Sequence, residues 1–155
     1  MLLKSIVSIV LCLAVGFLGS FFTRSSLDTW YAGLKKPVFN PPSWIFAPVW
    51  TALYVLIGFS AALVWEQGLG KADVRLALIV FLIQLFLNFL WSPAFFGRRS
   101  SRSGLVVIVL LWLAILATTT LFFGISCPAA LLLLPYLAWV SFAMVLNASI
   151  AYLNK

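Results

Sequence analysis

The sequence predicts an all-α integral membrane protein: one domain, residues 1–155, built as a five-transmembrane-helix bundle with a long ordered loop between the first two helices. Its 155 residues are 65% hydrophobic and 8% charged, which is far too apolar for a water-soluble domain of this size. A helix needs roughly 20 apolar residues to cross the hydrocarbon, and runs of that length occupy most of the chain. We expect spans at Leu2–Phe22, Ser43–Trp65, Val74–Phe96, Leu105–Ile125 and Ala129–Leu153.

Basic residues flank the expected spans and indicate the orientation of the chain. The net charge of +7 is scattered over these flanks, so we interpret it as a topology signal and expect no nucleic-acid partner. With the loops on alternate sides, one side holds Lys4, Lys71 and Arg75. The other side holds Arg24, Lys35, Lys36, Arg98, Arg99, Arg102 and Lys155. The positive-inside rule then predicts an outside N-terminus and a cytoplasmic C-terminus in a bacterial cell membrane, where basic residues also meet anionic lipid.

The first run is interpreted as a span rather than as a cleaved signal peptide. Lys4 precedes an apolar stretch, but there is no A-x-A cleavage site and the apolar character continues to Phe22. One face of this run carries mostly small residues, which let helices approach closely, so we expect that face to pack. The small face comprises Ser5, Ser8, Cys12, Val15 and Gly19.

Side chains for hydrolytic or metal chemistry are scarce. The chain has no His, and its three carboxylates, Asp28, Glu66 and Asp73, fall in or beside loops. Cys12 and Cys127 are expected at different depths, so we predict no disulfide between them. We therefore predict no catalytic residue, no metal ion and no obligatory cofactor.

The loop Thr23–Pro42 is the longest segment outside the expected spans. Pro41 and Pro42 lack backbone donors and have fixed φ angles, which predicts a shaped loop that ends where a helix can begin, at Ser43. Loops of about twenty residues are usually functional or disordered, and the aromatic and proline content here favours order. Its aromatic side chains would either roof a cavity in the bundle or form a belt at the membrane interface.

The second span places Trp50 and Tyr54 on one helix face. At that depth an indole N–H and a phenol O–H need polar partners. Pro48 should bend this span or loosen its first turns, which would widen a pocket there. Further on, Pro93 should kink or end the third span, and Gly97–Gly104 should form a tight basic turn.

Two other spans combine aromatic and amide side chains on one face. The third span carries four such residues at spacings of four, three and four: Gln84, Asn88, Trp91 and Phe95. Amides at this depth are costly, so the face must point into the bundle, toward a ligand or toward partners that join the helices. The fifth span repeats the pattern, with a small residue that leaves room for a flat molecule: Tyr136, Trp139, Ala143 and Asn147.

Several motifs of the chain resemble those of the tryptophan-rich sensory protein and translocator protein family, TspO/MBR. They occur in the family's order: Trp30-Tyr31, Leu34–Pro37, Asn40–Trp44, Trp50, Asn88–Gly97 and Pro135–Trp139. The resemblance implies a five-helix fold, commonly a homodimer, that binds porphyrins such as protoporphyrin IX and haem, sterols in some members, and synthetic isoquinoline carboxamides. By motif position it implies a ligand pocket at Tyr31, Pro41, Trp50, Tyr54, Gln84, Asn88, Trp91, Trp139, Phe142 and Ala143.

One residue departs from the family pattern. At Phe39, many members have Trp in the K-P-x-W-x-P-P run. Ala143 resembles a family position where a small side chain affects sterol and porphyrin binding. A weak cholesterol pattern also fits Leu146, Tyr152 and Lys155.

These features lead to one favoured hypothesis for function and two alternatives. The favoured one is a membrane protein that binds a porphyrin, a sterol or another flat apolar molecule, and has a transport, sensory or tetrapyrrole-regulating role. The first alternative is a light- or oxygen-dependent porphyrin-degrading enzyme, as proposed for some family members. The second is a purely structural protein, which would require every aromatic stripe to face lipid.

Overall fold

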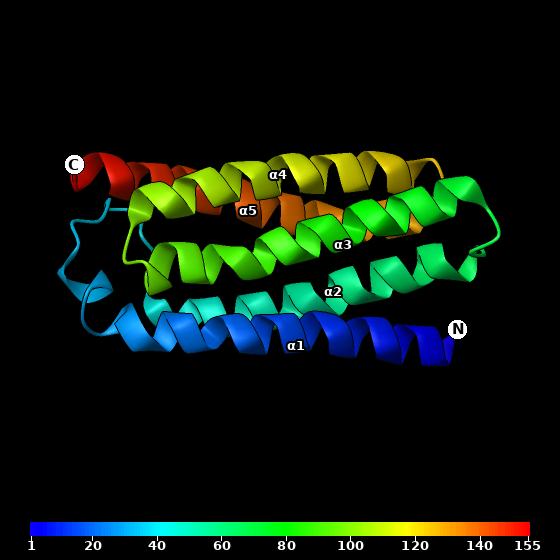
Figure 1. Ribbon diagram of the computed structural model, residues 1–155, viewed down its shortest axis with the longest axis horizontal. Helices are drawn as coiled ribbons and strands as arrows, with labels where there is room; N and C mark the ends of the chain where they lie inside the picture. The colour runs from blue at the N-terminus through cyan, green and yellow to red at the C-terminus, as the bar shows by residue number, and fades with distance from the viewer.

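The computed structural model describes all 155 residues and contains helices and turns but no strands (Figure 1). Five helices are long and apolar enough to cross a membrane, which confirms the predicted fold class. The helices are α1 (Leu2–Leu27), α2 (Phe46–Glu66), α3 (Ala72–Ser92), α4 (Ser101–Phe123) and α5 (Cys127–Leu153). Short helical turns occupy Tyr31–Gly33, Ser43–Ile45 and Pro93–Gly97.

The helices pack in a closed order around a common core. α1 packs against α2 and α3, α4 packs against α3 and α5, and α2 closes the bundle against α5. All five run along the long axis of the molecule, with the N-terminus at one end and the C-terminus at the other, beside the long loop (Figure 1). We call the end that carries this loop the loop end.

The small face of α1 packs inside the bundle, as predicted. Ser5, Ser8, Cys12 and Gly19 are all buried. On the partner helix, a Cβ added to Gly58 would lie only 2.6 Å from the Cα of Ile9, so the two backbones approach closely. At the end opposite the loop, Lys4 Nζ lies 3.0 Å from Glu66 Oε2 and joins the same two helices.

Two predicted boundaries are wrong, and serine side chains explain both. Helix α1 continues past Phe22 to Leu27, because the Ser26 hydroxyl donates a 2.8 Å hydrogen bond to the carbonyl of Phe96 and holds the extra turn against the bundle. Helix α4 begins inside the predicted Gly97–Gly104 turn, where the side chain of Ser100 caps it by accepting a 3.1 Å bond from the Ser103 N–H.

Proline ends the α-helical part of the third span, as predicted. α3 stops at Ser92 and continues as the π-helical turn Pro93–Gly97, which the Arg98 N–H closes with a 2.9 Å bond to the carbonyl of Pro93. The turn buries two rings, leaving Phe95 1% and Phe96 5% exposed. It thereby builds a small aromatic core at the loop end.

The long loop is attached to this aromatic core and to α5. Tyr31 is buried, with its ring centroid 5.5 Å from that of Phe96. The Asn154 side chain accepts a 3.0 Å bond from the Lys35 N–H and donates a 2.8 Å bond to the Lys35 carbonyl. These contacts give the loop a defined shape, as its composition predicts, although Phe39 remains 46% exposed.

Candidate functional site

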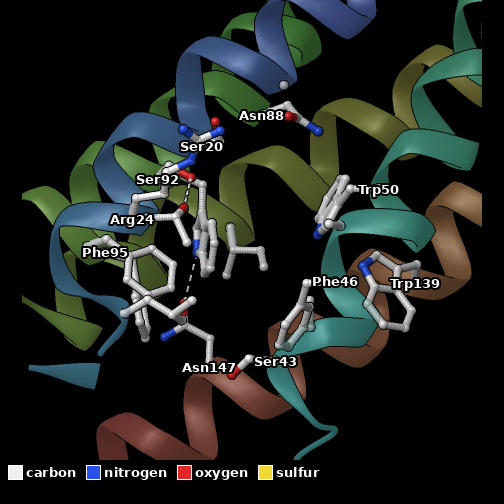
Figure 2. Close-up of a pocket in the computed structure, with 18 of the residues that line it drawn as sticks. Ser20, Arg24, Ser43, Phe46, Trp50, Asn88, Ser92, Phe95, Trp139 and Asn147 are labelled. Carbon is white, nitrogen blue, oxygen red and sulfur yellow. Dashed lines mark hydrogen bonds between the residues drawn. The ribbon is translucent and has the colours of Figure 1, made fainter. Parts of the chain in front are cut away.

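A cavity of about 630 Å³ lies inside the bundle toward the loop end (Figure 2). Of its 26 lining residues, 17 are hydrophobic, and they come from all five helices and the loop. Small-molecule sites in proteins typically enclose about 300–1,000 Å³ with mostly apolar walls and a few polar groups. The cavity therefore has the size and character of a ligand site.

Most of the pocket residues expected from the family resemblance line this cavity. Gln84, Phe142 and Pro41 do not: Gln84 is fully buried behind the wall, Phe142 packs with its ring centroid 5.6 Å from that of Trp139, and Pro41 is a half-buried loop residue. The residues that line it are Tyr31, Trp50, Tyr54, Asn88, Trp91, Trp139 and Ala143.

Aromatic rings from α2 and α5 form one wall. Phe46, Trp50 and Trp139 lie together on that side (Figure 2). The ring centroids of Phe46 and Trp139 are 6.1 Å apart, and those of Trp50 and Tyr54 are 5.6 Å apart. Ala143 follows Trp139 by one helical turn and leaves space beside this wall. A flat ligand could stack there.

Polar side chains on three helices form a chain of hydrogen bonds behind the cavity. The Tyr54 hydroxyl donates to Asn88 Oδ1 at 2.7 Å, and Asn88 Nδ2 donates to the Tyr136 hydroxyl at 2.8 Å. The Tyr136 hydroxyl donates in turn to Gln84 Oε1 at 2.7 Å. The two amides of α3 thus meet partners on α2 and α5, although Gln84 Nε2 is buried without a partner. Gln84 joins helices, whereas Asn88 does so and also borders the cavity.

A second polar contact fixes the opposite wall. The indole N–H of Trp91 donates to Asn147 Oδ1 at 3.0 Å, and Asn147 Nδ2 donates to the carbonyl of Ser101 at 2.8 Å. The Trp91 ring also stacks on Phe95, with centroids 5.0 Å apart and planes inclined by 25°. Trp91 is therefore held in one orientation with its face available to the cavity.

One buried polar atom of the lining has no partner. The indole N–H of Trp139 is buried and makes no hydrogen bond. Its nitrogen lies on the side of the ring that faces Trp50 and the cavity (Figure 2). An unsatisfied buried donor costs about 1–3 kcal/mol, so a ligand acceptor placed here would recover that energy.

Tyr31 closes the cavity from the loop. Its hydroxyl donates a 3.3 Å bond to Asn40 Oδ1, and Lys36 Nζ lies 4.8 Å from its ring centroid. Burial raises the pKa of the Tyr31 hydroxyl, and this effect outweighs the opposing effect of its hydrogen bond to Asn40. The phenol therefore stays neutral at physiological pH, as a lid over an apolar cavity requires.

The mouth of the cavity opens sideways, between α1 and the start of α2. Every exposed residue of the lining lies on these two segments: Phe17, Arg24, Ser43, Ala47 and Thr51. The family resemblance names no residue of α1, so the sequence analysis misses this side. Gly16, Ser20 and Arg24 recur at helical spacing and could have identified it, although Arg24 lies beyond the predicted end of the span at Phe22.

The weak cholesterol pattern does not form one surface. Leu146 is buried and lines the cavity, whereas Tyr152 is 68% exposed and borders a separate shallow depression on the outside. Lys155 Nζ lies 4.4 Å from the Tyr152 ring centroid, so those two residues do meet.

Comparison with known proteins identifies the family. A sequence model of the TspO/MBR family matches residues 8–153. The chain belongs to the TspO/MBR family. Membership agrees with the five apolar helices, so the protein is a multi-pass integral membrane protein.

Relatives of this TspO/MBR chain occur in all three domains of life. The tryptophan-rich protein TspO of Chlorobaculum tepidum is 51% identical, over 93% of this chain and 91% of its own length. That of Archaeoglobus fulgidus is 49% identical, over 99% and 98%. The translocator protein of Homo sapiens is 44% identical, over 84% of this chain and 78% of its own.

Proposed function

We propose that this TspO/MBR protein binds a flat, largely apolar ligand with polar edges, of the porphyrin class, in the cavity between its helices. The observation that carries the proposal is the cavity itself: about 630 Å³, walled by aromatic rings and supplied with an unpartnered indole N–H at Trp139. Protoporphyrin IX and haem are the ligands we propose first. Sterols and other flat molecules are further candidates for the same aromatic walls.

The biological role we propose is transport, sensing or regulation of the bound tetrapyrrole. Two relatives support this through their names: translocator protein in Homo sapiens and tryptophan-rich sensory protein in Cereibacter sphaeroides, which is 39% identical to this chain. The bound molecule would reach the cavity through its lateral mouth. We also propose a homodimer in the membrane, as the family resemblance implies.

The distribution of basic residues supports one orientation of the protein in the membrane. Most of the basic residues belong to the loop end, so we propose that this end is cytoplasmic and the N-terminus is outside. The mouth of the cavity would then open within the cytoplasmic leaflet.

Protoporphyrin IX titration into protein in phosphatidylcholine nanodiscs tests the proposed function. We expect saturable quenching of Trp fluorescence. Replacing Trp139 by Phe keeps a ring but removes the free N–H, and should weaken binding by about two- to tenfold, the equivalent of one hydrogen bond. Trp50→Phe, in the same wall, should also weaken it.

Trp44→Phe is the matched control, because Trp44 is 73% exposed and lies outside the cavity. It should leave the affinity unchanged. Wild-type protein that shows no saturable quenching would overturn the proposal.

A further inference from the structure

Arg24 is the only charged residue that lines the cavity. It lies near the end of α1, at the lateral mouth, and its side chain is exposed. In Figure 2 it lies on α1 across the cavity from the aromatic wall that carries Phe46 and Trp139. The cavity thus has a cation at one side and stacked rings at the other.

No acidic group neutralises this cation. The ion pairs of the protein join Glu66 to Lys4 and to the N-terminus, at the end opposite the loop. The Cζ of Arg24 lies 5.7 Å from the ring centroid of Phe21, and its guanidinium makes no hydrogen bond within the protein. Its five N–H donors are therefore available to a bound molecule.

Hydroxyl groups surround the same part of the mouth. Ser20 precedes Arg24 by one helical turn, and Ser43, in the turn before α2, also lines the cavity. The hydroxyls of Thr23 and Ser92 lie 3.2 Å apart on the adjoining wall. Polarity is therefore separated across the cavity, which suits a ligand that is apolar at one edge and anionic at the other.

We infer that Arg24 is the anion-recognising residue of this cavity and pairs with a carboxylate of the bound ligand. The cavity then selects flat apolar molecules with an acidic edge over neutral molecules of the same shape. This inference rests on the proposed function and adds the class of ligand to it. A planar guanidinium binds a carboxylate through two parallel N–H bonds, and the contact is strong at the edge of a low-dielectric cavity.

The position of Arg24 distinguishes it from basic residues that only set the orientation of the chain in the membrane. Arg98, Arg102 and Lys155 belong to the same end of the bundle but line no part of the cavity. Arg24 instead shares the cavity face of α1 with Gly16 and Ser20, at multiples of four residues. A charge that only set orientation would not need to lie on this face.

Protoporphyrin IX and its dimethyl ester test the inference, because they share one ring but only the acid is anionic at neutral pH. We expect wild-type protein in phosphatidylcholine nanodiscs to bind the acid more tightly than the ester. Arg24→Gln should weaken binding of the acid by about tenfold, the loss expected for a charge-assisted hydrogen bond, and leave the ester unchanged. Arg98→Gln, an exposed residue at the same end, should change neither.

The outcomes separate the inference from the proposed function. If Arg24→Gln weakens both ligands equally, or neither, then Arg24 does not recognise the acid and the inference is overturned while porphyrin binding stands. If wild-type protein binds neither porphyrin, the proposed function itself fails.

A lipid phosphate offers the same chemistry as a carboxylate, so the titrations are repeated in dodecyl maltoside micelles, which contain no phosphate. Direct pairing predicts that the effect of Arg24→Gln on the acid persists there. An effect confined to nanodiscs would show that Arg24 acts through lipid, and would overturn the inference.

Discussion

The indole N–H of Trp91 on α3 donates a 3.0 Å hydrogen bond to the side-chain oxygen of Asn147 on α5. Because Asn147 also donates to the carbonyl of Ser101 at the start of α4, one amide joins three helices. The bond sets the orientation of an aromatic wall before any ligand arrives. Stability and binding are therefore connected at this position.

Replacing Asn147 by Ala should destabilise the bundle. The change removes both hydrogen bonds and leaves the buried Trp91 N–H without a partner, so we expect a loss of about 2 kcal/mol in the free energy of unfolding. Unfolding by dodecyl sulfate in mixed micelles, followed by circular dichroism, measures it. Ser149→Ala is the control, because the Ser149 hydroxyl bonds only to the carbonyl of Val145 in its own helix. Equal stability of the two variants would contradict the prediction.

Gly58→Ala should loosen the contact between α1 and α2. The added Cβ would lie 2.6 Å from the Cα and 2.9 Å from the N of Ile9, and neither backbone atom can move away without shifting the helix. We expect a destabilisation of about 1–3 kcal/mol in the same unfolding assay. Gly70→Ala should cost little in comparison, because a Cβ there meets no atom within 4 Å. If the two variants have the same free energy of unfolding, α1 and α2 do not pack as closely at Gly58 as the prediction requires.

Ala143→Phe should fill the cavity. Ala143 lines it one turn beyond Trp139, so a ring at this position would occupy the space of a ligand. We expect the affinity for protoporphyrin IX to fall by about tenfold or more while the protein remains folded. Ala52→Phe places the same ring on the exposed face of α2, outside the cavity, and should bind like wild type. Undiminished binding by Ala143→Phe would place the ligand elsewhere.

Illumination should separate binding from porphyrin degradation. The cavity lining contains no carboxylate, Cys or His that could transfer protons during a reaction, although Trp50 and Trp139 could take part in electron transfer. We expect the Soret band of bound protoporphyrin IX to bleach no faster than that of free porphyrin in the same micelles, and without turnover. Faster loss that requires intact protein and continues over several equivalents would establish the enzymatic alternative.

Cys127 provides a native probe of orientation. It is exposed at the first residue of α5, at the end opposite the loop, whereas Cys12 is buried. With the N-terminus outside, a membrane-impermeant maleimide should label Cys127 in intact cells that express the protein, and Cys127→Ser should abolish the signal. Labelling that appears only after lysis would reverse the proposed orientation.

Helix positions could be predicted well from the sequence, but helix ends could not. The apolar runs locate all five spans, since each must cover the hydrocarbon. The end of α1 depends instead on a hydrogen bond from Ser26 to the carbonyl of Phe96, 70 residues away in the chain. Hydropathy carries no information about such a tertiary contact.

The sequence predicts which helix faces point into the bundle, but not which residues on those faces reach the cavity. Helical spacing correctly indicates that Gln84 and Asn88 point into the bundle, yet only Asn88 reaches the cavity. That difference depends on which neighbours each residue meets: the Gln84 oxygen accepts a 2.7 Å bond from the buried Tyr136 hydroxyl, whereas Asn88 bonds to Tyr54, which lines the cavity. The α1 side could not be predicted in this way, because Gly16 and Ser20 carry no aromatic or amide side chain and Arg24 is explained equally well as a topology signal.

The sideways mouth between α1 and α2 has a kinetic consequence. A ligand that enters from the hydrocarbon meets the protein at its concentration in lipid, so the rate of binding should follow the mole fraction of ligand in the bilayer rather than its concentration in water. Occupancy at equilibrium does not depend on the route of entry. The lateral mouth therefore sets how fast the cavity fills and empties.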